Sequence, residues 1–277
     1  MAESAEPYGL IAGNGRFPFL VLESARIQNI GIIVAAIKGE TLSEIDSCGY
    51  PVHWLNIGQL GKLIRIFKEA GVKKALMAGQ VKHVQIFSSA IPDLTMIRML
   101  ASLKQKNTDS IIGGVARILE EMGITLIDST AFLKPHLATV GPLTRRGLNP
   151  REQSDLDYGL PIAHQIASMD IGQTIVVRDR AVVAIEAMEG TDAVIQRAGQ
   201  LAGKKDLTVI KTSKPSQDMR FDVPVVGVPT IRNMINGGAT ALVVAAGKTL
   251  IFDREEMVAL ADQNDIAVVG MPPMDRI

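Results

Sequence analysis

The segment 211–227 combines positive and negative side chains in a pattern that suits phosphate chemistry. It follows an apolar run, 207–211, that is typical of a buried strand. Its charged residues are Lys211, Lys214, Asp218, Arg220 and Asp222. Carboxylate oxygens bind a hard cation, and Lys or Arg can neutralise the remaining negative charge of a phosphate. Pro215 and Pro224 restrict the backbone around these side chains. The alternative interpretation is a solvated, charged loop.

A second group of acids, Glu186, Glu189 and Asp192, falls within a span of seven residues at a predicted strand-to-helix junction. This spacing can supply oxygen ligands to one cation, although acids are also favoured at the start of a helix by its dipole. Gly190 predicts a tight turn, and Thr191 or Asp192 is expected to cap the following helix. We expect the strands that end at 186 and 211 to lie side by side.

Alternating strands and helices predict the framework that holds these segments. In the first half of the chain, short apolar runs alternate with longer segments of helical spacing, which is typical of a parallel sheet with helices on both faces. The expected strands are 8–12, 30–37, 51–55, 73–78 and 124–128. The expected helices are 19–28, 57–70, 93–103 and 109–122.

Glycines follow two of these strands at the edge where ligands of such sheets bind. Gly13, Asn14 and Gly15 follow the first strand, and Gly79 and Gln80 follow the fourth. We therefore predict that these five residues bind substrate, together with Gly190 and Thr191. The dinucleotide-binding fingerprint is incomplete, because a proline stands where its third glycine belongs. A tight strand-to-helix turn is the alternative.

The predicted fold class is therefore α/β with two domains. We expect an N-terminal Rossmann-like domain at 1–132, a linker at 133–149 in which Arg145 and Arg146 are solvated, and a C-terminal mixed α/β domain at 150–277. The C-terminal domain should begin with a helix capped by Asn149 and interrupted near Gly159 and Pro161. A hairpin is expected at 174–186.

Composition excludes several classes of function. Lys+Arg and Asp+Glu both number 29, and aromatic residues make up 4% of the chain, so no nucleic-acid partner is expected. The one cysteine, Cys48, cannot form an internal disulfide. The four histidines lack zinc-site spacing, and neither a G-x-S-x-G elbow nor a Walker phosphate loop occurs. No apolar run reaches the roughly 20 residues that span a bilayer, so we expect a cytoplasmic protein that can touch a membrane surface.

Three phrases of the sequence together resemble the LpxI-type UDP-2,3-diacylglucosamine pyrophosphatases. They are the residues 9–18, GLIAGNGRFP, the residues 189–192, EGTD, and the residues 214–227, KPSQDMRFDVPVVG. This resemblance implies an enzyme of lipid A biosynthesis that uses Mg²⁺. Such an enzyme hydrolyses an acylated UDP-sugar, UDP-2,3-diacylglucosamine, to UMP and 2,3-diacylglucosamine 1-phosphate (lipid X). It also implies that lipid X is held between the two domains and that Asp222 is essential.

Together, the residue pattern and the resemblance give a hypothesis for the site. Asp222 would bind Mg²⁺ with Asp192, and Glu189 and Asp218 are further candidate ligands. Lys211, Lys214 and Arg220 would stabilise the charge that develops during attack on the sugar-side phosphorus. The substrate places the protein transiently at the inner-membrane surface, and a homodimer is the expectation for a fold of this kind.

Two other functions are compatible with the same residues. A non-catalytic protein that sequesters an acylated phosphosugar or a nucleotide would need the glycines and bases, but would not need Glu189, Asp192 and Asp222 together. A hydrolase of a nucleotide-diphosphate sugar without acyl chains would keep the acids and need no apolar recess.

Overall fold

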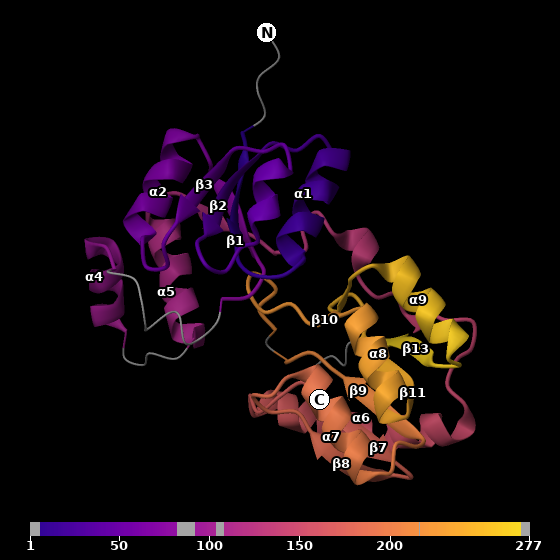
Figure 1. Ribbon diagram of the computed structural model, residues 1–277. Helices are drawn as coiled ribbons and strands as arrows, with labels where there is room; N and C mark the ends of the chain where they lie inside the picture. The colour runs from indigo at the N-terminus through magenta and orange to yellow at the C-terminus, as the bar shows by residue number, and fades with distance from the viewer. Residues whose placement is uncertain (1–5, 82–91, 104–107, 216, 273–277) are drawn as a thin grey trace. The chain divides into compact units, whose positions relative to one another are not determined.

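The computed structural model describes residues 6–81, 92–103, 108–215 and 217–272. The chain divides into two compact units, each of which is an α/β structure (Figure 1). Unit 1 contains the residues up to Leu133 and the short segment Asp218–Phe221. Unit 2 contains Lys134–Gln217 and Asp222–Ile277. The predicted fold class is confirmed.

Unit 1 is built on a parallel sheet of order β3-β2-β1-β4-β5. Its strands are β1 (Tyr8–Ala12), β2 (Ile32–Ile37), β3 (Val52–Leu55), β4 (Lys74–Ala78) and β5 (Thr125–Leu126). Its helices are α1 (Phe17–Ile27), η1 (Ser43–Ser47), α2 (Leu60–Glu69), α4 (Leu94–Ser102) and α5 (Thr108–Glu121). All five strands run in the same direction, so their carboxyl ends lie at one edge of the sheet.

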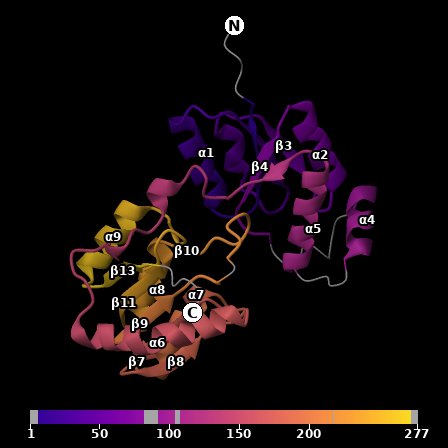
Figure 2. The ribbon, with the colours of Figure 1, turned by 180° about the vertical axis from the view of Figure 1, so that it is seen from behind.

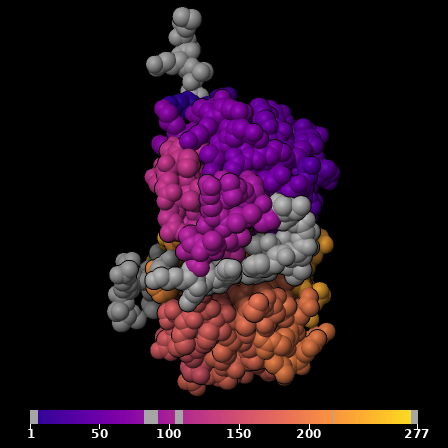
Figure 3. Space-filling view, turned by 90° about the vertical axis from the view of Figure 1, so that its left-hand side faces the viewer, coloured from indigo at the N-terminus to yellow at the C-terminus, as the bar shows by residue number. Residues whose placement is uncertain are grey.

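Helices cover both faces of this sheet. α1 lies on one face, and α2 and α5 lie on the other, as the two opposite views show (Figures 1 and 2). α4 packs outside α2 and α5, and it lies beside α5 on the surface (Figure 3). The core on this side joins strand residues such as Ala75 to Phe67 of α2 and Leu119 of α5, each of which is fully buried.

Unit 2 is built on a mixed sheet of order β6-β13-β11-β9-β7-β8. Its strands are β6 (Gly141–Pro142), β7 (Thr174–Arg178), β8 (Ala181–Ile185), β9 (Leu207–Lys211), β11 (Ala239–Ala245) and β13 (Ala267–Met271). A small parallel pair is formed by β10 (Val225–Val226) and β12 (Leu250–Ile251). The helices are η2 (Lys134–His136), α6 (Pro150–Ser168), α7 (Thr191–Leu201), α8 (Val228–Gly237) and α9 (Arg254–Gln263).

Side chains alternate between the two faces of the second sheet, as the period of a strand requires. In β7, Ile175 and Val177 join a cluster with α6, whereas Val176 joins a cluster with α7, α8 and α9. The sheet is therefore buried on both faces. This double burial explains why β9 is apolar along most of its length and buried at every position.

Several local predictions hold and others are corrected. The capping box of Asn149 and Glu152 forms, and the hairpin of β7 and β8 is present. α6 runs unbroken through Gly159 and Pro161, which corrects the expected interruption. A Cβ at Gly159 would lie 2.6 Å from Cδ1 of Ile210, so this glycine allows the helix to approach the sheet closely.

Other corrections concern the N-cap of α7 and the neighbours of β9. Gly190, with φ of 85°, is the N-cap of α7, and no side chain caps this helix, which corrects the cap expected at Thr191 or Asp192. β7 lies between β8 and β9, so the ends of these two strands are not direct neighbours. Because β7 is antiparallel to both, β8 and β9 still end at the same edge.

The segment expected to be a linker packs within unit 2. β6 pairs with β13, and Leu137 forms a bridge to Leu250. Arg146 is not simply solvated, because its guanidinium donates to both carboxylate oxygens of the fully buried Glu152, at 2.8 and 3.0 Å. Burial acts to raise the pKa of Glu152, but hydrogen bonds from Arg146, the Asn149 backbone and Thr240 outweigh it, and the pKa is lowered.

Candidate functional site

A buried lysine lies at the centre of the polar site in unit 2. Lys211 is the last residue of β9, and only 7% of it is exposed. Its Nζ donates a hydrogen bond to Oγ1 of Thr191, the first residue of α7, at 2.6 Å. Thr191 Oγ1 in turn donates to Oε1 of Glu186 at 3.1 Å. Sheet edge and helix start are thus joined by one chain of hydrogen bonds.

Acids around this lysine partly offset the effect of its burial on its pKa. Burial lowers the pKa of Lys211, and the nearby charges of Glu186, Asp222 and Asp192 act in the opposite direction without cancelling the effect. Oε2 of Glu186 is buried and has no hydrogen-bond partner among the described residues. An unpartnered buried carboxylate oxygen is costly unless another group supplies a donor or a cation.

Asp222 is held on several sides within unit 2. Gln173 Nε2 donates to its Oδ2 at 3.2 Å, and Lys214 Nζ lies 3.4 Å from the same oxygen. The Gln217 side chain links Lys214 to Asp222. Its Nε2 donates to the Asp222 carbonyl, and its Oε1 accepts from the Lys214 N–H at 2.8 Å. Lys214 also pairs with Asp170 at 2.5 Å.

These contacts define the Lys211 cluster, which consists of Gln173, Glu186, Thr191, Lys211, Lys214 and Asp222, together with Asp192, whose charge acts on Lys211. It brings together five of the predicted site residues: Thr191, Asp192, Lys211, Lys214 and Asp222. Gln173 and Gln217 were missed by the sequence prediction, which considered only charged side chains and glycine turns; Gln217 lies within the phrase 214–227, whereas Gln173 belongs to none of the three phrases. Gln173 contacts Asp222 across 49 residues of sequence, and Gln217 contacts it from five residues away.

Two other predicted site residues pair with each other in unit 1. Arg220 donates from Nε to Oδ1 of Asp218 at 2.9 Å and from Nη2 to Oδ2 at 2.7 Å. The hydrogen bond from Arg220 lowers the pKa of Asp218. Glu189 is similarly paired with Arg197, which lowers the pKa of this exposed carboxyl. Arg220 contacts both carboxylate oxygens of Asp218, whereas Arg197 contacts only Oε1 of Glu189.

Among the residues that the structure describes, no group of three or more His, Cys, Asp and Glu side chains is arranged to hold a metal ion. Mg²⁺ needs fewer protein ligands than such a group provides, because one or two carboxylates commonly bind it together with water and substrate phosphates. Asp222 and Asp192 both act on the charge of Lys211. The donor chemistry of the Lys211 cluster therefore fits this minimal kind of magnesium site.

The predicted glycine turns lie against each other in unit 1. Asn14 and Gln80 exchange backbone hydrogen bonds of 2.7 and 3.1 Å. A Cβ at Gly13 would lie 2.6 Å from the Gln80 carbonyl oxygen, and one at Gly79 would lie 2.5 Å from that of Asn14. These glycines are thus needed for close backbone approach. Gly15, with φ of 88°, has open space around it before α1.

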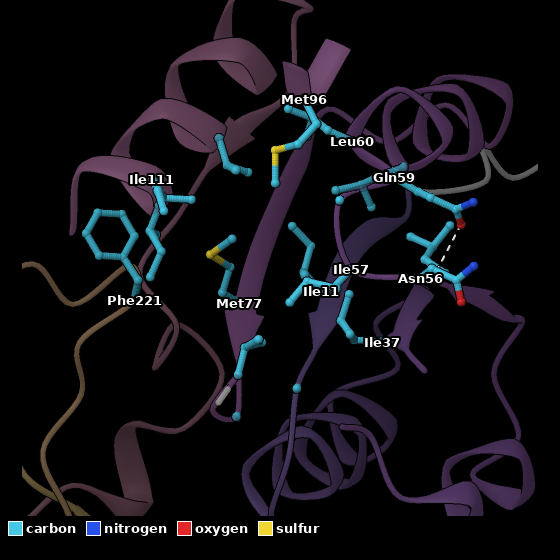
Figure 4. A pocket seen from close by; sticks show the side chains of 18 of the residues that line it. Ile11, Ile37, Asn56, Ile57, Gln59, Leu60, Met77, Met96, Ile111 and Phe221 are labelled. Carbon is cyan, nitrogen blue, oxygen red and sulfur yellow. Dashed lines mark hydrogen bonds between the residues drawn. The ribbon is translucent and has the colours of Figure 1, made fainter. Parts of the chain in front are cut away.

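Gly13 and Gly79 also line an apolar pocket in unit 1 (Figure 4). Its volume is about 180 Å³. The lining includes Ile11 and Met77 from the sheet, Met96 from α4, Ile111 from α5, and Phe221. The few polar side chains around it include Asn56 and Gln59, and the amide oxygen of Gln59 accepts from the Asn56 N–H at 2.9 Å. Such a pocket suits a hydrocarbon group better than a phosphate.

The fold and the two sites define an α/β protein of two units, one with a polar cluster suited to phosphate and the other with an apolar pocket. Comparisons with known proteins agree with this description. The LpxI N-terminal domain model matches residues 7–136, and the LpxI C-terminal domain model matches residues 139–269. The chain therefore belongs to the LpxI family.

One relative is the UDP-2,3-diacylglucosamine pyrophosphatase LpxI of Caulobacter vibrioides. It is 30% identical to this chain over 278 residues, and the alignment covers 97% of this chain and 98% of that protein. The resemblance noted from the three sequence phrases is thereby confirmed along nearly the full length.

Proposed function

We propose that this protein hydrolyses the pyrophosphate bond of UDP-2,3-diacylglucosamine to give UMP and 2,3-diacylglucosamine 1-phosphate. Family membership supports the substrate. The observation that carries the proposal is the Lys211 cluster, in which a buried ammonium group is surrounded by carboxylates and lies close to Asp222. Sequestration without turnover would not require acids in this arrangement.

The lysines of the cluster bind the pyrophosphate. The buried ammonium of Lys211 is oriented by Thr191, so it requires little rearrangement when negative charge develops on a phosphoryl oxygen. Lys214 exchanges its partner Asp170 for a second phosphoryl oxygen. Arg220 remains a predicted contributor, and its release from Asp218 is the change that this role requires.

Asp222 and Asp192 would hold a Mg²⁺ ion in the loaded enzyme. When bound, this ion supplies charge neutralisation at the phosphate and orients water. Gln173 and Gln217 keep the Asp222 carboxylate and carbonyl in place. Glu189 and Asp218, the two further candidate ligands, are each paired with an arginine, and substitution of each by its amide tests whether it contributes.

The apolar pocket of unit 1 would take acyl carbon atoms of the substrate. Each buried methylene contributes about 0.8 kcal/mol, so a pocket of this lining adds substantial affinity. This observation favours an acylated sugar over the non-acylated alternative. The glycine turns beside the pocket would contact the sugar or the nucleotide through backbone groups.

The acylated substrate suggests where in the cell the enzyme works. Among the described residues, no helix combines the length and the apolar character that crossing a bilayer requires. We propose a cytoplasmic enzyme that takes its substrate from the inner-membrane surface and releases lipid X there. A homodimer remains a prediction, which sedimentation of the purified protein would test.

The decisive experiment incubates the purified protein with UDP-2,3-diacylglucosamine in H₂¹⁸O, with Mg²⁺ and then with EDTA. We expect UMP release that stops with EDTA. Attack on the sugar-side phosphorus places ¹⁸O in the sugar 1-phosphate and leaves UMP unlabelled. A control reaction with Asp157→Asn, an exposed acid on α6, should match the wild type.

Each other outcome has a distinct meaning. Label in UMP would reverse the assigned point of attack. Tight binding without UMP release would indicate a sequestering protein. Equal turnover of the deacylated UDP-sugar would contradict the role of the apolar pocket.

A further inference from the structure

The short segment Asp218–Phe221 belongs to unit 1, although the residues on both sides of it belong to unit 2. Ser129, which is almost fully buried, holds the segment by two hydrogen bonds. Its N–H donates to the Met219 carbonyl at 2.9 Å, and its Oγ donates to the Arg220 carbonyl at 2.6 Å. The backbone of the segment is therefore fixed to unit 1.

Phe221 ends this segment with its ring at the apolar pocket. The ring packs against the core of unit 1 and lies on the same side of the pocket as Ile111 (Figure 4). The guanidinium of Arg220 lies 5.1 Å from the ring centroid. An apolar group that fills the pocket therefore contacts the Phe221 ring.

The next residue is Asp222, whose side chain belongs to the Lys211 cluster. Its carboxylate interacts with Gln173 and Lys214, and its carbonyl accepts from Gln217. Covalent geometry sets consecutive Cα atoms about 3.8 Å apart across a planar peptide. Few soft dihedrals separate the ring of Phe221 from the carboxylate of Asp222, so a displacement of the ring can be transmitted to the carboxylate through a short stretch of backbone.

We propose that Phe221 is a positioning residue that couples occupation of the apolar pocket to the placement of the Asp222 carboxylate. The pocket ligand is an acyl chain, so this inference rests on the proposed function. A chain in the pocket holds the Phe221 ring, and the ring fixes the backbone from which Asp222 projects. The acyl chain thereby contributes to kcat as well as to KM, as remote binding energy can.

The test measures kcat and KM of three proteins on UDP-2,3-diacylglucosamine and on the same UDP-sugar without acyl chains. The proteins are the wild type, Phe221→Ala and Ile112→Ala. Ile112 is a matched control, because it lines the same pocket from α5 but is far from Asp222 in the chain. Phe221→Leu is added because it refills the pocket wall without an aromatic ring.

For the wild type, we expect removal of the acyl chains to lower kcat. Phe221→Ala should lower kcat on the acylated substrate by about 10- to 100-fold, the effect expected of a small misplacement. Its kcat should then be insensitive to the acyl chains. Ile112→Ala should raise KM and keep kcat, and Phe221→Leu should restore most of kcat.

The inference is overturned if Phe221→Ala, like Ile112→Ala, changes only KM, or if wild-type kcat is the same with and without acyl chains. These results would leave the proposed hydrolysis intact. Failure of the proposed function looks different, because the wild type itself would then release no UMP from either substrate.

Discussion

Lys211 Nζ donates its hydrogen bond to Thr191 Oγ1 at 2.6 Å, which joins the end of β9 to the start of α7. A hydroxyl oxygen that accepts from an ammonium group favours the charged form of the lysine. Burial opposes this effect and leaves the pKa of Lys211 below its ordinary value. The balance between these two effects leads to the first prediction.

The pH profile of kcat should fall on its alkaline side, and Lys211 should set the pH at which this fall, the alkaline limb, occurs. Because its pKa is lowered, Lys211 loses its proton as pH rises, at a pH below the ordinary lysine value of about 10.4. kcat should therefore fall with rising pH across that range. Thr191→Val should move the limb to lower pH, whereas Thr191→Ser should leave it in place. A limb that is unchanged in Thr191→Val would contradict the assignment.

Loss of the ammonium itself should be more severe. Lys211→Met should lower kcat by about two to three orders of magnitude, the usual cost of removing one well-placed charge stabiliser. Lys205→Met is the control, since this lysine is exposed. Rates of UMP release at a fixed pH provide the measurement, and similar rates in both variants would exclude a catalytic role.

Asp222→Asn should lower kcat by about two to three orders of magnitude as well, because the amide keeps the shape but loses the charge. Asp192→Asn should also raise the Mg²⁺ concentration needed for half-maximal rate. Glu189→Gln should have little effect, because Glu189 is paired with Arg197 at an exposed position. Magnesium titrations of the three variants make the comparison. A large shift with Glu189→Gln alone would identify it as the ligand.

Glu152 and Arg146 should stabilise unit 2. Glu152→Ala removes the buried acceptor of Arg146 and Thr240 and empties a fully buried position, while Asp265 still pairs with Arg146. The free energy of unfolding should therefore fall by about 1–3 kcal/mol. Because the pKa of Glu152 is lowered in the fold, its contribution is present above its unfolded value and is lost as pH falls below it. Urea unfolding of Glu152→Ala and Asp157→Ala tests this, and equal stability would refute it.

The glycine turns should tolerate no side chain. Gly13→Ala places a Cβ 2.6 Å from a backbone oxygen, so we expect a loss of about 1–3 kcal/mol in the free energy of unfolding. Gly113→Ala in α5 is the matched control, because nothing lies within 4 Å of its Cβ, and it should be neutral or stabilising. Thermal unfolding of both variants supplies the comparison. A Gly13→Ala protein as stable as the control would show that the turn can open.

His164 offers a pH test of folding. Burial lowers its pKa, and its Nδ1 lies 3.3 Å from Thr212 Oγ1. The unfolded chain therefore binds a proton more readily than the fold. Stability should be complete above about pH 6.5 and decline as pH falls through that value. His164→Gln should weaken this decline, as measured by unfolding between pH 5 and 8; an unchanged slope would place the effect elsewhere.

Local patterns determined much of this protein. Apolar runs bounded by glycines predicted most of the main strands, and the capping box of Asn149 and Glu152 formed as expected. These features depend on neighbours a few residues apart, so they can be read from the sequence. The predicted Lys211, Thr191 and Asp222 also come together, because parallel strand ends gather at one edge.

Only the tertiary structure decided which charges face one another. Asp218 and Asp222 are four residues apart and carry the same group, yet Asp218 pairs with Arg220 in unit 1 and Asp222 interacts with Lys214 in unit 2. Hydrogen bonds from Ser129, 90 residues or more away in sequence, hold the backbone between them. Such long-range bonds, and the contacts of Arg146 with Thr240 and Asp265, depend on the packing of distant segments, which has no local signature in the sequence.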